Sequence, residues 1–252
     1  MRLMWELDIC HLYPDLLNLY GDRGNVIAIL KRCEWRGIRT RVSPVSIGDP
    51  FDAERYDIVL LGGGQDYEQK ILQPDLLLQK GSEIRNYITH GGVTLAICGG
   101  YQLLGNFYQT PDGEQLKFLG ALDFATFGGK KRMIGDLVFQ CGLLKSENCD
   151  GILAGFENHS GKTFLGPGVK PLGRVLRGHG NNGKDHTEGA LFRNTVCSYG
   201  HGSLLPKNPA LTDYLIDTAF RRKYGVPAPA VMTDDSLEKL AHAAACRKSS
   251  FL

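Results

Sequence analysis

Cys98 is the residue whose surroundings most favour chemistry. It follows a run of apolar or β-branched residues, Val93–Ile97, and precedes Gly99 and Gly100, after which a helical pattern begins at Tyr101. This order predicts a strand, a sharp turn and a helix, with the thiol lifted clear of the sheet edge. The N–H groups at the start of a helix favour a thiolate. Most single cysteines are structural, but the coincidence of strand, glycines and turn favours a nucleophile.

Two further segments carry suitable groups after predicted strands. Gly62, Gly63 and Gly64 offer backbone N–H groups that could hold an oxyanion or a carboxamide oxygen, although a glycine triplet can also be a flexible turn. His201 lies between two glycines at the end of a late strand pattern. A lone histidine is more often structural than catalytic, but a cysteine nucleophile needs a base. Ligands of open parallel sheets bind beyond the carboxyl ends of strands, so Cys98 and His201 together indicate a thiol acyl-transfer enzyme.

The elements that must position these groups alternate along the first half of the chain. Strand patterns lie at residues 3–11, 39–45, 56–61 and 93–97, and helical patterns lie at 24–36, 67–79 (interrupted by Pro74) and 82–90. Residues 117–192 are rich in glycine and short β-like runs, such as 137–141 and 174–176, followed by a strand at 195–199 and helices at 208–224 and 234–247. We therefore expect an α/β fold, with a central, mostly parallel sheet flanked by helices and with added antiparallel strands. The expected division is one domain over residues 1–225 and a C-terminal helical extension over 226–252.

Composition limits the possible functions. The chain has 252 residues, 42% of them hydrophobic, which suits one large domain with or without a small extension. Its net charge of +2 and its lack of a dense Lys/Arg run do not suggest a nucleic-acid partner. The seven cysteines show no paired spacing and no CxxC motif, which favours reduced thiols in a cytosol. We expect neither a signal peptide nor a transmembrane segment, because no apolar run approaches the roughly 18–20 residues that a membrane helix needs.

Ordered sequence blocks run through almost the whole chain: HLYPDLLNLYGDRGN, GGGQD, AICGGYQLLG, RMIGD, GFENHSGKTFL, GNNGKDHTEG and YGHGSLLPKNP. In these blocks the chain resembles the class I (triad-type) glutamine amidotransferases, in the branch that contains the glutaminase domains of cobyric acid synthase. Within that branch it is similar to glutaminase subunits that work with a Mur-ligase-like synthetase. The resemblance implies a single class I amidotransferase domain that hydrolyses L-glutamine.

The resemblance also implies roles for individual residues. The nucleophile falls on Cys98, the catalytic histidine on His201 and a substrate-binding arginine on Arg132, while the oxyanion glycines fall on residues 62–64 and on Gly99. The implied partner is a Mur-ligase-family subunit that carries ATP and Mg²⁺ and amidates the α-carboxyl of D-glutamate in lipid II. We expect no cofactor or metal in this chain itself. The implied location is the bacterial cytoplasm, with the partner bringing the heterodimer to the inner face of the membrane.

The acid of the triad is the point at which the chain departs from the wider class. Many class I amidotransferases carry a glutamate two residues after the histidine, whereas here His201 is followed by Gly202 and Ser203. Three alternatives stay open: another acid of this chain, with Glu188 and Asp185 first in line; an acid from the partner; or a Cys–His dyad. The glutaminase subunits that the chain resembles share this absence.

Other readings remain as alternatives. They are a cobyric-acid-type glutaminase, a DJ-1-like cysteine hydrolase and a non-catalytic partner-binding module. The stretch GHGNNGK at 178–184 fits glycine-rich nucleotide-binding patterns, but Asp185 stands where a P-loop needs a hydroxyl, so we expect only a glycine-rich loop near the active site. His179, His186 and His201 lack the spacing of metal ligands. The block Glu157-Asn158-His159 is expected to be structural or part of an interface.

Overall fold

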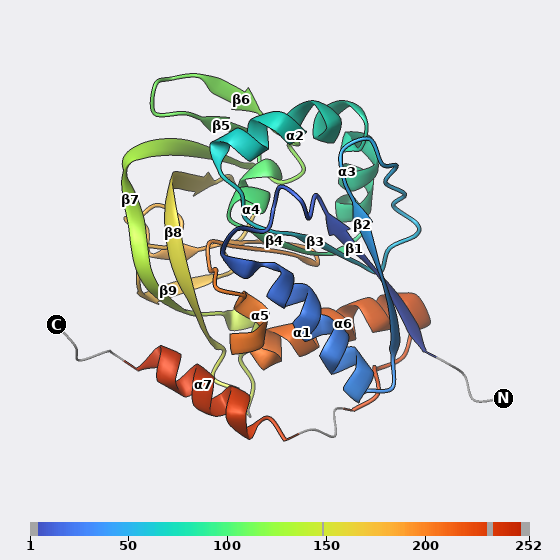
Figure 1. The fold of residues 1–252 in the computed structure, drawn as a ribbon. Helices are drawn as coiled ribbons and strands as arrows, with labels where there is room; N and C mark the ends of the chain where they lie inside the picture. Colours follow the sequence, from blue (N-terminus) through green and yellow to red (C-terminus); the bar gives the residue numbers. More distant parts are fainter. Residues whose placement is uncertain (1–4, 148, 231–233, 248–252) are drawn as a thin grey trace.

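The computed structural model describes residues 5–147, 149–230 and 234–247, and it contains two six-stranded sheets with helices around them (Figure 1). The strands of the first sheet are β1 (Glu6–Leu12), β2 (Arg39–Val45), β3 (Ile58–Leu61), β4 (Val93–Ile97), β11 (Ala190–Phe192) and β12 (Thr195–Ser198). Their order across the sheet is β11-β12-β4-β3-β1-β2. All neighbouring pairs are parallel except β11 with β12. This is the central, mostly parallel sheet that the sequence predicts.

Helices cover both faces of this sheet, with α1, α5 and α6 on one face and α2 and α3 on the other (Figure 1). The helices are α1 (Arg23–Trp35), α2 (Asp66–Leu78), α3 (Gly81–Thr89), α4 (Gly99–Leu103), α5 (Leu204–Lys207), α6 (Pro209–Tyr224) and α7 (Ser236–Cys246), with short 3-10 turns η1 (Leu19–Gly21) and η2 (Gly142–Leu144). Every residue of β3, β4 and β12 is buried, since both faces of the sheet are covered. The apolar sequence of β3 and the mainly apolar sequence of β4 are consistent with this burial.

The antiparallel strands mostly form a sheet of their own. Its strands are β5 (Phe107–Gln109), β6 (Gln115–Lys117), β7 (Phe124–Gln140), β8 (Ile152–Leu165), β9 (Gly173–Arg177) and β10 (Thr187–Glu188). Only β11 is added to the central sheet. The long strands β7 and β8 pair along most of their length and shift register between Gly128 and Met133. The short runs predicted at 137–141 and 174–176 belong to β7 and β9, so the sequence patterns understate the length of β7.

Several predicted boundaries differ from the structure. Helix α2 continues through Pro74, because the capping box of Gln65 and Glu68 fixes its first turn and its apolar face packs through Leu72 and Leu76. The predicted interruption at Pro74 is therefore wrong. The predicted first strand starts at residue 3, but residues 3 and 4 lie outside the described part of the chain. Across residues 5–147, 149–230 and 234–247, no helix is long and apolar enough to span a lipid bilayer.

Helix α7 lies against the end of the molecule that carries α5 and β8 (Figure 1). Asp235, just before α7, pairs with Arg32 of α1 at 2.8 Å, and the ring of His242 contacts the carbonyl oxygen of Lys207 at 3.0 Å. Arg177 donates to the carbonyl oxygen of Ala245 at 2.7 Å. These contacts attach the segment to the rest of the chain, and the domain boundary at residue 225 stays a prediction.

Candidate active site

Cys98 occupies a strained turn between β4 and α4. Its backbone has φ 66° and ψ −95°, a conformation that costs a non-glycine residue free energy and that marks strand-to-helix turns carrying a nucleophile. The predicted strand, turn and helix are all present, but α4 begins at Gly99 rather than at Tyr101. The N–H of Cys98 donates to the carbonyl oxygen of Ser198 at 2.9 Å, which fixes the turn to the end of β12.

The resting state of the thiol differs from the sequence-based expectation. Cys98 is only 6% exposed, and burial raises its pKa well above the usual range, while the nearby Asp22 adds to the increase. The positive end of the short α4 does not overcome this desolvation, so the expectation of a favoured thiolate is wrong. The thiol is neutral in this state and needs a base to remove its proton.

The strand register brings His201 to the same sheet edge as Cys98. β12 pairs in parallel with β4, with Ser198 opposite Ile97, so the residues that follow the two strands emerge side by side. The backbone of His201 also pairs with Phe156 of β8, which holds the histidine between the two sheets. Burial, which is the largest cause, and the electrostatic effects of His159 and Arg132 together lower the pKa of His201 to about 3. His201 is therefore neutral at physiological pH, as a proton-accepting base must be.

The glycine loop after β3 lies against both the turn that carries Cys98 and the ring of His201. The N–H of Gly100 donates to the carbonyl oxygen of Gly62 at 3.0 Å. A Cβ on Gly99 would lie 2.5 Å from the backbone of Gly64, and a Cβ on Gly63 would lie 2.5 Å from Cε1 of His201. Only glycine permits this approach, so the predicted oxyanion loop packs closely against the residue after Cys98 and against the ring of His201.

Gly63→Ala tests this close approach. We expect the new methyl group to displace the His201 ring and to lower kcat for glutamine hydrolysis by about 10²-fold, because catalysis is that sensitive to displacements of about 1 Å. The matched control is Gly142→Ala, since a Cβ there meets no atom within 4 Å. Steady-state kinetics of the two variants provide the measurement, and equal activity of both would contradict the assigned geometry.

A cavity of about 210 Å³ opens beside Cys98. Its walls include Gln102 of α4, Tyr108 of β5, Arg132 of β7 and His159 of β8, so both sheets contribute to it. Cavities for drug-sized ligands are about 300–1,000 Å³, so this one suits a single small metabolite. A larger cavity of about 570 Å³ lies near α6 and α7, next to Asn208 and His242, away from the predicted site residues.

Arg132 reaches the cavity from the second sheet. Its Nε donates to Oδ1 of Asn158 at 2.7 Å, and its Nη2 donates to the carbonyl oxygen of Asn158 at 3.0 Å. These two bonds from the neighbouring strand β8 hold the guanidinium plane in place. Arg132 thus lines the same cavity as Cys98, where its charge can meet a carboxylate.

Glu188 and Asp185, the acids that the sequence put first, form hydrogen bonds with residues close to them in the chain. Glu188 accepts hydrogen bonds from Oγ of Ser198 at 2.7 Å and from the N–H of Tyr199 at 2.9 Å. Asp185 accepts bonds from Thr187 and from the side chain of Asn182, which close the loop before β10. Both acids therefore stabilise local structure, and their candidacy as the third member of a triad stays a prediction.

A buried carboxylate near His201 that sequence reasoning did not single out is that of Asp22. Its Oδ2 lies 3.9 Å from Nδ1 of His201 and accepts the N–H of Gly63 at 2.7 Å. The available signal was the block that contains it, LYGDRGN, where a single aspartate precedes a helix. That position reads as an ordinary helix start, and nothing local indicates contact with a residue so far along the chain.

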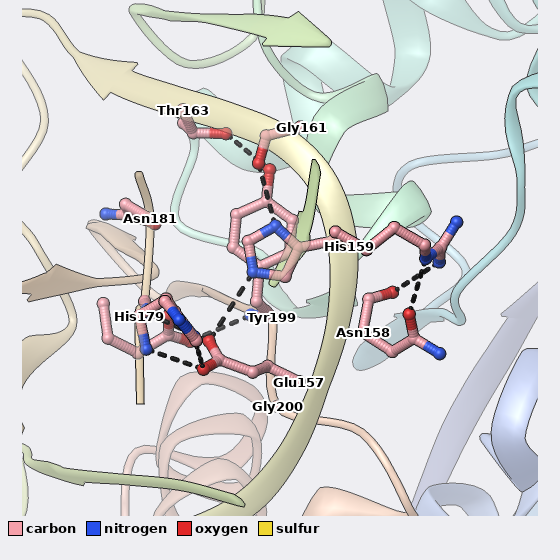
Figure 2. A network of polar contacts seen from close by, with 12 residues as sticks. Glu157, Asn158, His159, Gly161, Thr163, His179, Asn181, Tyr199 and Gly200 are labelled. Carbon is pink, nitrogen blue, oxygen red and sulfur yellow. Dashed lines mark hydrogen bonds and ion pairs between the residues drawn. The ribbon is translucent and has the colours of Figure 1, made fainter. Parts of the chain in front are cut away.

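The block Glu157-Asn158-His159 also forms part of the site wall. Figure 2 shows the contact between Glu157 and His179. Oε1 of Glu157 accepts the backbone N–H of His179 at 2.6 Å and lies 2.8 Å from the ring Nδ1 of the same residue. His159 faces Glu157 at 3.6 Å and stacks on Tyr199, with ring centroids 3.6 Å apart. Burial would raise the pKa of Glu157, but its contacts with His159 and His179 and with backbone N–H groups hold the pKa below its usual value. The block thus holds His179 through Glu157, and it places Asn158 and His159 in the cavity wall.

The glycine-rich loop at 178–184 is bound to β8 by hydrogen bonds, and its backbone N–H group at Gly180 is used in this way. The N–H of Gly180 donates to Glu157 at 2.9 Å, and Asn182 donates to the carbonyl oxygen of Thr163 at 3.1 Å. These two hydrogen bonds attach the loop to β8. Within the described part of the chain, no group of three or more His, Cys, Asp or Glu side chains could hold a metal ion.

This chain is similar to known proteins both in sequence and in fold. Residues 8–209 match the CobB/CobQ-like glutamine amidotransferase domain. Lipid II isoglutaminyl synthase (glutamine-hydrolyzing) subunit GatD of Streptococcus pneumoniae is 43% identical, covering 88% of this chain and 83% of that protein. The protein of the same name from Staphylococcus aureus is 40% identical over 93% of both chains. Cobyric acid synthase of Pelotomaculum thermopropionicum is more distant, at 31% identity over 86% of this chain and 41% of that protein.

Solved structures agree on the fold. A glutamine amidotransferase from Thermotoga maritima aligns with a TM-score of 0.53 and 17% identity over 94% of both chains. PurLQS from the same organism aligns with a TM-score of 0.52 and 15% identity over 86% of this chain and 98% of that one. At such identities the likeness concerns the fold alone, whereas the family match extends over most of the sequence. The chain therefore belongs to the family of CobB/CobQ-like glutamine amidotransferases.

Proposed function

We propose that this chain is the glutaminase subunit of a lipid II isoglutaminyl synthase, with Cys98 as nucleophile and His201 as base. The observation that carries the chemistry is the placement of Cys98 on a strained turn beside the strand that ends at His201. Support for the pathway comes from the two GatD proteins, which are 43% and 40% identical to this chain. The chain is accordingly an amidotransferase that releases ammonia from glutamine for use by a partner.

The reaction divides into two acyl transfers. Glutamine binds in the cavity with its α-carboxylate on Arg132 and its side-chain amide at Cys98. His201 removes the thiol proton as the sulfur attacks the amide carbon, and N–H groups of Gly99 and of the loop at residues 62–64 stabilise the oxyanion. The C–N bond then breaks, and His201 returns its proton to the departing ammonia. Water, deprotonated by His201, cleaves the γ-glutamyl thioester and releases glutamate and the free thiol.

The ammonia needs an acceptor close to this site, because free ammonia in bulk cytosol is protonated and lost. The proposed partner is a MurT-like subunit of the Mur ligase family. That subunit would bind ATP and Mg²⁺, activate the α-carboxyl of D-glutamate in lipid II and use the ammonia to form D-isoglutamine. We place the resulting heterodimer in the cytoplasm, at the inner face of the membrane where its lipid substrate resides. This chain itself would require no cofactor.

The decisive experiment is an amide-transfer assay with the chain co-purified with its synthetase. Glutamine labelled with ¹⁵N in the side-chain amide should give labelled D-isoglutamine in lipid II when ATP and Mg²⁺ are present. Cobyric-acid-type precursors serve as the competing acceptor, since cobyric acid synthases are the more distant relatives. Transfer to the corrinoid acceptor and not to lipid II would replace the proposed pathway with that alternative. Absence of any glutaminase activity would overturn the proposed chemistry.

A further inference from the structure

The ring of His159 is buried in the wall of the cavity beside Cys98, and an oxygen atom faces each of its two nitrogens (Figure 2). Its Nδ1 lies 2.8 Å from the carbonyl oxygen of Gly161, and its Nε2 lies 3.6 Å from Oε2 of Glu157. Carbonyl and carboxylate oxygens accept protons but donate none, so each contact is favourable when the nitrogen carries a proton. A neutral imidazole has one N–H group and an imidazolium has two, so these surroundings favour the imidazolium.

Glu157 supplies the negative charge for this ring. Its side chain is fully buried, and its oxygens accept the backbone N–H groups of His179 at 2.6 Å and of Gly180 at 2.9 Å. Burial raises the pKa of Glu157, but these bonds and the contacts with the rings of His159 and His179 hold the pKa below its usual value. The ring of His179 is half exposed, so in its neutral form it can donate from Nδ1 and leave Nε2 to solvent. The buried His159 is therefore the better counter-ion for the carboxylate.

Tyr199 provides a further contact that favours a positive ring. Its aromatic ring lies parallel to that of His159 within 7°, with the ring centroids 3.6 Å apart. Burial raises the pKa of the Tyr199 hydroxyl, so the tyrosine is neutral. The face of a neutral aromatic ring attracts a cation, and the attraction is greater where water is excluded. Stacking thus stabilises the same charge state of His159 as the two oxygen atoms do.

Arg132 brings a second positive charge to the same cavity. It lies on β7 and donates two hydrogen bonds to Asn158, the residue before His159 on β8. Both Arg132 and His159 line the cavity beside Cys98. Burial is the largest cause of the low pKa of His201, and His159 and Arg132 lower that pKa as well, as positive charges near the ring do. Cys98 and His201 are neutral, so the two cations are not cancelled from the catalytic side of the cavity.

We propose that Glu157 holds His159 as a buried imidazolium, and that the charges of His159 and Arg132 together select a substrate with a free α-carboxylate. This inference rests on the proposed binding of glutamine beside Cys98. The two nitrogens of His159 face Glu157 and Gly161, so the ring acts on the substrate through its charge and not through a hydrogen bond. Glu157 is a positioning residue, because it acts on the substrate through His159. The competing explanation is that Glu157 serves only to hold the loop at 178–184 through His179.

The charge of His159 can be measured directly by long-range ¹H–¹⁵N NMR of the full chain, labelled with ¹⁵N-histidine, at pH 7. The two ring nitrogens of an imidazolium resonate close together, whereas those of a neutral ring resonate far apart. The signals of His159 are identified by their loss in His159→Asn, in which the amide can still donate to Gly161 from the position of Nδ1. We expect the imidazolium pattern in the unsubstituted chain and the neutral pattern in Glu157→Gln. A neutral pattern in the unsubstituted chain would overturn the inference, even if the variants fail to fold.

Selection of the carboxylate is tested with two substrates, L-glutamine and its α-amide, which lacks the carboxylate. We expect KM for glutamine to rise by about 10-fold in Glu157→Gln and in His159→Asn, because a charge near the carboxylate is lost. KM for the α-amide should not rise in either variant. If the α-amide is not hydrolysed, its inhibition constant against glutamine replaces KM. General damage to the site would weaken both ligands alike, and that result would contradict the proposed selection.

His179→Gln is the matched control, since it removes the other ring that contacts Glu157. The backbone N–H groups of residues 179 and 180 still hold the carboxylate, so we expect KM for glutamine to stay within about 2-fold. If KM rises as much in His179→Gln as in Glu157→Gln, the carboxylate serves the loop and the inference is overturned. Failure of the proposed function would be distinct, because the unsubstituted complex would then release no glutamate. In that case the NMR comparison still decides the charge of His159, and calorimetric affinities for the two ligands replace KM.

Discussion

Cys98→Ala is expected to lower glutamine hydrolysis by about 10⁴-fold or more, because the variant lacks the atom that forms the thioester. Cys98→Ser should be almost as slow, since a serine hydroxyl is a far weaker nucleophile than a cysteine thiol in the same position. Both variants should remain folded, because Cys98 contributes only a small side chain to the core. The measurement is glutamate release under saturating glutamine, together with a thermal unfolding curve for each variant.

Covalent labelling supplies the matched control for this result. Diazo-oxo-norleucine, a glutamine-like electrophile, should modify Cys98 and leave the half-buried Cys149 unmodified. Cys149→Ala should retain normal activity and normal labelling. Labelling spread over several of the seven cysteines, or activity retained by Cys98→Ala, would exclude Cys98 as the nucleophile.

Arg132→Ala is expected to raise KM for glutamine by about 10- to 100-fold with a smaller effect on kcat. The physical reason is the loss of charge-assisted hydrogen bonds to the α-carboxylate, which are worth about 1.5–3 kcal/mol. Arg132→Lys should recover only part of the affinity, since an ammonium cannot form the paired hydrogen bonds of a guanidinium. Steady-state kinetics over a wide glutamine range provide the measurement.

Lys131→Ala is the matched control for the arginine. Lys131 adjoins Arg132 on β7 and is exposed, and it is not among the residues of the cavity wall. We expect its removal to leave KM within about 2-fold, because a solvated surface charge contributes little. Equal and small effects of the two substitutions would mean that Arg132 is an ordinary surface residue of the KKR cluster.

The parts of this site that the sequence predicts are those with local signals. The turn at Cys98 follows from apolar residues, glycines and a helical pattern that all lie within a few positions of one another. His201 can be placed at the same edge because parallel strands end together, and β4 and β12 are indeed neighbours. The mostly parallel sheet follows from the alternation of strand and helical patterns. In each case the physical cause lies in the segment itself or in a general rule of sheet geometry.

The parts that the sequence does not predict depend on contacts between distant segments. Asp22 and His201 are brought together by the packing of α1 against the sheet, and no periodicity encodes that contact. Glu188 lies close to His201 in sequence, yet its carboxylate turns to Ser198 and to the backbone of Tyr199. The prediction that Cys98 favours the thiolate form differs from the structure for a related reason. The burial that raises the pKa of this thiol exists only in the assembled fold. Proximity along the chain was a poor guide to each of these side chains.

The position of β12 has a consequence for biosynthesis. This strand is made late, and it is inserted between β4 and the edge strand β11, which directly precedes it in the chain. Until the ribosome has released residues 190–198, the apolar strand β4 is an open edge that other chains can join. The nucleophile on its turn also has no base at that stage. A nascent or prematurely terminated chain would therefore be inactive and prone to aggregation. It would hydrolyse no glutamine until the final third of the protein has packed against the rest.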